Sequence, residues 1–163
     1  MRIYLIGLPG VGKSSVGKKL ASKMGYEYID LDEYIEYQAT LFVDEIFKLY
    51  GEEYFRALES NCLKELSTKE HIVISCGGGI IKTPKNKDLM DGLKCYLTAP
   101  LDEIEKRLEH SSIVRPILQS KSLKDLYLER KTAYENFADF MIENVRLEDT
   151  VEKIIKVIGE KNA

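Results

Sequence analysis

The feature that most constrains the fold of this chain is a glycine-rich segment at residues 7–14, with the sequence Gly7-Leu8-Pro9-Gly10-Val11-Gly12-Lys13-Ser14. It matches the pattern GxxxxGKS/T, whose glycines let backbone N–H groups turn inward around phosphate oxygens. Residues 2–7 before it are β-branched and aromatic, and residues 14–24 after it have apolar positions at helical spacing. We therefore predict a strand, a phosphate-binding loop (P-loop) and a helix whose positive end also faces the phosphate.

Two side chains of this loop have predicted roles of their own. The Lys13 ammonium would reach the β and γ phosphates of a nucleotide, and the Ser14 hydroxyl would be a ligand of Mg²⁺, a hard cation that prefers oxygen. The predicted nucleotide site in this segment consists of Gly10, Val11, Gly12, Lys13, Ser14 and Ser15.

The rest of the chain alternates short apolar strands with helical segments. Further strands are expected at 26–30, 71–76, 94–98 and 140–143, and two or three helices between 31 and 66. Other helices are expected near Pro84, from Pro100, over 122–138, and from a capping sequence at Asp149 to about Gly159. This alternation predicts one α/β domain, residues 1–163, with a five-stranded parallel sheet flanked by helices. Ligands of such sheets bind at the carboxyl ends of the strands.

Residues 110–121 lack clear periodicity, and we expect them to form a mobile lid loop. In a phosphotransferase, closure of such a loop would keep water from attacking the nucleotide. A plain surface loop is the alternative.

Composition argues against several functional classes. With 24 Lys+Arg against 27 Asp+Glu, the net charge of −3 provides no overall basic field for duplex nucleic acid. No apolar run reaches the roughly 18 residues of a membrane span, and no cleavable leader is evident, so we expect a soluble, cytoplasmic protein. Cys62, Cys76 and Cys95 form no CxxC pair, and with only His71 and His110 available, neither a disulfide framework nor a histidine-based metal site is indicated.

Acidic residues at the end of the second predicted strand are candidates for the reaction itself. Asp30 could hold water on Mg²⁺ while Asp32 faces a substrate hydroxyl. Either carboxylate could instead cap the following helix.

Arginines are the second group of candidates. The chain uses 18 Lys but only six Arg, so we expect each Arg to occupy a position that needs the geometry of its planar guanidinium. Arg56 and Glu59 share one helix face, where a guanidinium held by a glutamate would suit a carboxylate ligand. An ordinary surface ion pair is the alternative. The glycines at 77–79 follow a predicted strand and would let the backbone approach a small ligand, unless they are only a flexible strand exit.

Taken in order, these motifs resemble the shikimate kinase family along nearly the whole chain. The resemblance is carried by the P-loop, Asp30-x-Asp32, Phe55-Arg56-x-x-Glu59, the triple glycine, Arg115-Pro116-Ile117-Leu118 and the segment from Arg130 to Tyr134. It implies a compact P-loop kinase with a nucleoside-monophosphate-kinase-like fold. The implied reaction transfers the γ-phosphoryl group of ATP to the 3-hydroxyl of shikimate, in the biosynthesis of chorismate and aromatic amino acids.

The resemblance also implies roles for particular residues. Lys13, Asp32 and Arg115 would be catalytic, with Arg115 carried by the lid onto the transferring phosphoryl group. Ser14 would hold Mg²⁺ with Asp30 in its outer shell. Arg107 would lie along adenine. The shikimate carboxylate would contact Arg56 and Arg130, and the ring hydroxyls would contact the glycine loop at Gly77, Gly78 and Gly79, chiefly the amides of the last two.

Some positions depart from the family pattern. The spacing between Arg107 and Arg115 is one residue longer than expected, Thr132 stands where a proline is common, and Asp149 replaces a frequent proline near adenine. Two alternatives stay open at this point: a different small-molecule kinase, acting on gluconate or a nucleoside monophosphate, and a nucleotide-dependent switch. We expect no nucleic-acid or membrane partner, and a monomer.

Overall fold

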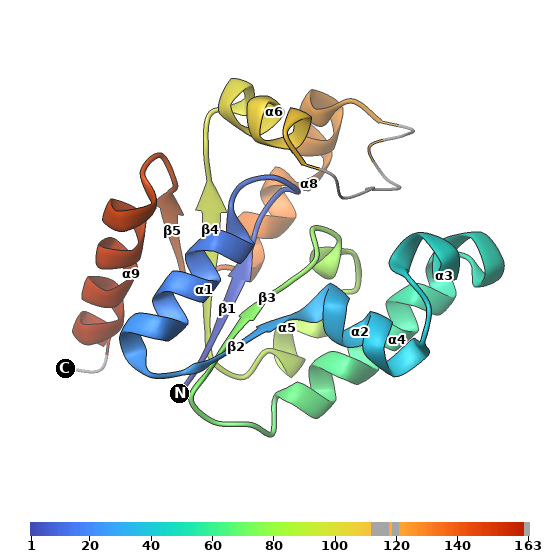
Figure 1. Cartoon of the computed structure of the whole chain (residues 1–163), viewed down its shortest axis with the longest axis horizontal. Helices are drawn as coiled ribbons and strands as arrows, with labels where there is room; N and C mark the ends of the chain where they lie inside the picture. The colour runs from blue at the N-terminus through green and yellow to red at the C-terminus, as the bar shows by residue number, and fades with distance from the viewer. Residues whose placement is uncertain (112–117, 119–120, 162–163) are drawn as a thin grey trace.

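The protein is described by a computed structural model that covers residues 1–111, 118 and 121–161. Its centre is a five-stranded parallel sheet (Figure 1). The strand order is β2-β3-β1-β4-β5, and all four neighbouring pairs are parallel. The strands are β1 (Arg2–Ile6), β2 (Glu27–Asp30), β3 (Ile72–Ser75), β4 (Leu93–Thr98) and β5 (Phe140–Glu143). The predicted fold class is confirmed, and the carboxyl ends of the strands meet at one edge.

Helices cover both faces of this sheet. Helices α1 and α9 contact each other and lie in front of the sheet in Figure 1, whereas α8 packs against β4 from behind. Helices α2, α3 and α4 pack on one another as the helical segment predicted between residues 31 and 66. The bounds are α1 (Lys13–Met24), α2 (Leu31–Ala39), α3 (Val43–Tyr50), α4 (Glu52–Leu66), η1 (Ile80–Lys82), α5 (Asn86–Leu89), α6 (Leu101–Glu109), α8 (Leu123–Phe137) and α9 (Leu147–Lys161).

Burial explains why the strands are short apolar runs rather than alternating ones. A parallel sheet with helices on both sides buries both faces of its inner strands. All four residues of β3 are buried, as is β1 from Ile3 onward. The three cysteines are buried as free thiols within this core. No helix in the described part of the chain combines the length and apolar character needed to cross a membrane.

The expected cap of the last helix was wrong. Helix α9 begins at Leu147, two residues before Asp149, and extends to Lys161, beyond Gly159. The Thr150 amide donates to the Arg146 carbonyl oxygen as the first backbone bond of the helix, and the Thr150 hydroxyl donates to the same oxygen, each at 3.0 Å. Asp149 therefore lies in the first turn of the helix, where a carboxylate favours the positive end of the helix dipole.

Candidate functional site

The P-loop leaves β1 at the centre of the carboxyl edge, between β3 and β4. Gly12 adopts a φ of +106°, which side chains rarely allow, and a Cβ there would lie 2.3 Å from Asn144 Nδ2. Helix α1 begins at the next residue, Lys13. The Lys13 ammonium donates to the carbonyl oxygens of Gly7 (2.7 Å) and Leu8 (2.9 Å). The loop therefore has its anion-binding shape, with a cation at its mouth.

Asp30 caps helix α2, one of the two roles considered for it, while its role toward Mg²⁺ stays a prediction. One carboxylate oxygen accepts from the Glu33 amide at 3.1 Å and caps α2. The other lies 3.4 Å from the Ser14 hydroxyl, which donates to it. The Ser14 hydroxyl oxygen and the neighbouring Asp30 oxygen are the kind of ligand that a hard cation prefers. Within the described residues, however, no cluster of three or more acidic, cysteine or histidine side chains could hold a metal ion alone. A Mg²⁺ ion would therefore need phosphate oxygens and water as its remaining ligands.

Asp32 lies beside the glycine loop that follows β3. A Cβ on Gly77 would be only 2.8 Å from Asp32 Oδ1, and this oxygen is buried without a hydrogen-bond partner. The pKa of Asp32 is raised to about 6, first by burial and then by the charge of Asp30, with the nearby Lys13 ammonium opposing both effects. The structure thus places an unsatisfied carboxylate within the field of the P-loop lysine.

Arg56 projects from α4 with carboxylates on both sides of its guanidinium. Nη1 donates to Glu59 Oε1 at 3.0 Å, while Nε and Nη2 donate to Glu52 at 3.3 and 3.2 Å. Lys82 also donates to Glu52, at 2.6 Å. The alternative of a surface pair with Glu59 is wrong, because the Glu59 side chain is 0% exposed. Burial raises the pKa of Glu59 to about 7, against the stabilising charge of Arg56.

The triple glycine makes room for these side chains. A Cβ on Gly79 would lie 2.3 Å from Arg56 Nη2, and one on Gly78 would lie 3.0 Å from both Arg130 Nη1 and Pro9 Cδ. Arg130 comes from α8, is 3% exposed, and keeps its Nε buried without a partner. The two arginines predicted to bind a carboxylate therefore approach the same glycine loop, from different helices.

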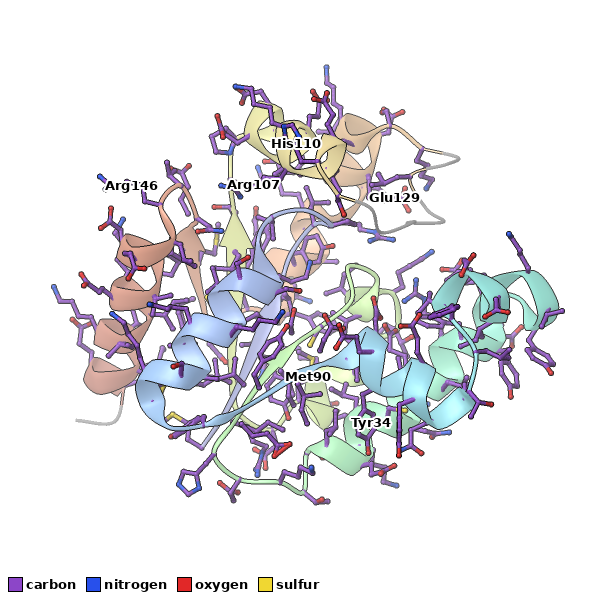
Figure 2. The ribbon with its side chains drawn as sticks, viewed as in Figure 1. Tyr34, Met90, Arg107, His110, Glu129 and Arg146 are labelled. Carbon is purple, nitrogen blue, oxygen red and sulfur yellow. The ribbon has the colours of Figure 1, made fainter. Side chains whose placement is uncertain are left out.

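Arg107 lies on the β4 side of the P-loop, opposite the glycine loop that follows β3. Arg107 belongs to α6, and Figure 2 shows it near the carboxyl edge of the sheet, while Arg146 lies just before the first residue of α9. The Arg107 guanidinium donates to the carbonyl oxygens of Val11 and Asn144, both at 2.9 Å. A contact with adenine stays a prediction. Arg115, predicted to be catalytic, and most of the predicted lid lie outside the described residues.

Asn144 is a functional candidate that the sequence analysis missed. It follows β5, and its side chain donates to the Val11 carbonyl oxygen at 2.9 Å and accepts from the Thr150 hydroxyl at 2.8 Å. Asn144 and Arg107 thus both donate to the carbonyl oxygen of Val11 in the P-loop. Its place at the carboxyl end of a predicted strand was the available signal, but that signal alone does not distinguish it from an ordinary loop residue.

We predict that Asn144→Ala weakens nucleotide binding, because the P-loop loses a buried donor at Val11. The dissociation constant for ADP with Mg²⁺, measured by titration calorimetry, should rise about tenfold, which corresponds to about 1.4 kcal/mol. Asn86→Ala is the matched control, since Asn86 is also buried and forms two hydrogen bonds, to Ser60 and to the Ile80 carbonyl. Equal effects of the two substitutions on ADP binding would contradict the role given to Asn144.

The raised pKa of Glu59 predicts a pH-dependent stability. Between pH about 4.5 and 7 the folded protein keeps a proton that the unfolded chain releases, so stability falls as pH rises through this range. Glu59→Gln should match the wild type near pH 4.5 and exceed its free energy of unfolding by about 1–3 kcal/mol at pH 8. Urea unfolding at both pH values measures this, with the exposed Glu160→Gln as control. A wild type and Glu59→Gln variant with parallel pH profiles would refute it.

Comparisons with known proteins identify the family. A sequence profile of shikimate kinase matches residues 9–159. The shikimate kinase of Macrococcus caseolyticus is 36% identical over 160 residues, covering 94% of each chain. That of Halorhodospira halophila is also 36% identical, covering 96% of this chain and 93% of its own.

Solved structures agree with this assignment. A shikimate kinase from Acinetobacter baumannii in complex with shikimate superposes with a TM-score of 0.91 at 32% identity, covering 98% of this chain and 93% of that one. The shikimate kinase of Bacteroides thetaiotaomicron gives a TM-score of 0.89, also at 32% identity, and covers 98% of both chains. A match of this extent in both sequence and fold means that the chain belongs to the shikimate kinase family.

Proposed function

We propose that this protein transfers the γ-phosphoryl group of ATP to the 3-hydroxyl of shikimate, giving shikimate 3-phosphate and ADP. One observation supports the acceptor above all others: Asp32, Arg130 and Arg56 border three consecutive glycines directly beside the P-loop. Shikimate carries a carboxylate and ring hydroxyls on one small ring. An acceptor of this kind fits a site that places two guanidinium groups and one carboxylate around a loop of three glycines.

The two arginines give the acceptor its orientation. Arg56 is held by Glu52 and Glu59, so its guanidinium is fixed before a ligand arrives. Arg130 is buried, with an unpartnered Nε that a ligand oxygen could satisfy. Binding the carboxylate between these groups would turn the opposite side of the ring toward Asp32 and the P-loop. Charge-assisted bonds of this type provide both affinity and direction.

Phosphoryl transfer passes through a loose transition state, so alignment and charge neutralisation account for most of the catalysis. Lys13 would hold the β and γ phosphates at the mouth of the loop. Ser14 and Asp30 would hold Mg²⁺, which would neutralise negative charge on the phosphates. Asp32 would orient the acceptor hydroxyl and take its proton as the new bond forms, a role that its raised pKa favours. Arg115 would approach the transferring group from the lid.

A nucleoside-monophosphate or gluconate acceptor is the alternative, since paired arginines also bind phosphate, and gluconate carries a carboxylate and hydroxyls too. The short glycine loop bordered by Asp32, Arg56 and Arg130 suits the compact shikimate ring better than the extended gluconate chain. We place the reaction in the cytoplasm, where ATP is supplied, and expect the chain to act as a monomer.

The test is ADP release by the purified protein with ATP and Mg²⁺, comparing shikimate, gluconate, AMP and no acceptor. We expect release with shikimate at least about 100-fold above the other three, because only shikimate fits both the arginines and the glycine loop. Turnover with gluconate or AMP but not shikimate would overturn the acceptor. ATP hydrolysis that is equal in all four reactions would favour the nucleotide-dependent switch.

A further inference from the structure

Lys82 is bonded to one of the two carboxylates that hold Arg56. Its ammonium donates to Glu52 Oε2 at 2.6 Å, and the same oxygen accepts from Arg56 Nε and Nη2 at 3.3 and 3.2 Å. The pKa of Glu52 lies below its usual value, first because of the hydrogen bond from Lys82; burial opposes this effect and Arg56 adds to it. One carboxylate oxygen is therefore shared by two cations that come from different segments of the chain.

The backbone that carries Lys82 is fixed beside the glycine loop. Lys82 ends the short helix η1, which begins directly after the third glycine. Its amide donates to the Gly79 carbonyl oxygen at 3.0 Å, and the side chains of Ile80 and Ile81 are buried. Helix η1 also packs against α8, the helix of Arg130. The Lys82 side chain therefore starts from an anchored turn, and its ammonium lies at Glu52 with 31% of the side chain exposed.

A second cation is needed here because Arg56 has two acidic partners. When Glu52 and Glu59 are both ionised, they and Arg56 together have a net negative charge, which would repel an anionic acceptor. Lys82 returns this group to neutrality. The positive charge of Arg130, on the other side of the glycine loop, then remains in excess to attract the acceptor.

Arg56 keeps donors for a ligand in this arrangement. A guanidinium has five N–H groups. Within the described residues, three of those on Arg56 donate to Glu52 and Glu59. One N–H on each terminal nitrogen is left, so a ligand carboxylate can bind without displacing either glutamate.

We propose that Lys82 is a positioning residue for the acceptor carboxylate: by pairing with Glu52 it offsets the negative charge beside Arg56, so that this guanidinium can bind an anionic acceptor. The inference rests on the proposed function, and it adds a residue that acts through Glu52 rather than on the acceptor itself. Its effect should appear in acceptor binding, and only for acceptors that carry a negative charge. Because Lys82 is partly exposed, solvent screens the interaction and the effect should be moderate.

Steady-state kinetics of Lys82→Met tests the proposal, because methionine keeps an unbranched apolar stem and removes the charge. We expect the KM for shikimate to rise about 3–10-fold, with the KM for ATP and the kcat within about twofold of the wild type. Lys69→Met is the control, since Lys69 also pairs with a glutamate, Glu27 at 3.5 Å, but at the amino end of the sheet. A smaller rise in a folded Lys82→Met variant, or an equal rise in the control, would overturn the proposal.

A double-mutant cycle with Glu52→Gln separates action through Glu52 from a merely structural role. In the Glu52→Gln background, Lys82→Met should raise the KM for shikimate by less than about twofold, because the carboxylate that Lys82 neutralises is gone. A penalty as large as in the wild-type background would mean that Lys82 acts independently of Glu52, and would contradict the proposal.

The charge of the acceptor provides an independent readout. With the uncharged methyl ester of shikimate, the Lys82→Met penalty on KM should also fall below about twofold, since no negative charge is left to repel. Lys82→Arg keeps a cation that can donate to Glu52, and should hold the KM for shikimate within about twofold of the wild type. Equal penalties for shikimate and its ester, or a loss in Lys82→Arg as large as in Lys82→Met, would count against the proposal.

Failure of this inference and failure of the proposed function give different results. Shikimate turnover by the wild type, with an unchanged KM in Lys82→Met, would reject the role of Lys82 and leave the reaction assigned. A wild type that does not turn over shikimate would reject the reaction and this inference together.

Discussion

The pairing of β1 with both β3 and β4 is the constraint on which the rest of the structure depends. Because the three strands are parallel, their carboxyl ends lie side by side. The P-loop leaves β1 between the glycine loop after β3 and the start of α6 after β4. The nucleotide and acceptor parts of the site thus touch through Pro9 and Gly78, although these residues lie far apart in the sequence.

The site also contains several buried ionisable side chains. Asp32 and Glu59 both have raised pKa values because burial disfavours their charged forms, and each has an oxygen without a hydrogen-bond partner. Arg130 likewise has an unsatisfied Nε. Such ionisable groups cost stability, and these three lie around one glycine loop, whereas the other buried side chains without a partner in the described residues are the neutral hydroxyls of Tyr4 and Tyr28. This is the pattern expected where binding chemistry, rather than folding, determines the residue types.

Much of this arrangement could be predicted from the sequence, because its signals are local. Strand composition, the P-loop pattern and the helix spacing predicted the sheet, and the glycines at 77–79 marked a close approach. Contacts between distant segments could not be predicted. The bond from Asn144 to Val11 and that from Tyr134 to Gly78 join residues 133 and 56 positions apart. The contact of the Thr150 hydroxyl with Asn144 likewise has no sequence signature.

Arg56 and Arg130 are together proposed to recognise the carboxylate of the acceptor. The most direct measurement compares kcat/KM for shikimate with that for its uncharged methyl ester, in the wild type and in Arg56→Leu and Arg130→Leu variants. The wild type should prefer shikimate by at least about 100-fold, and each variant should lose most of this preference, because the charge-assisted bonds are gone. A preference that survives in both folded variants would contradict carboxylate recognition by these arginines.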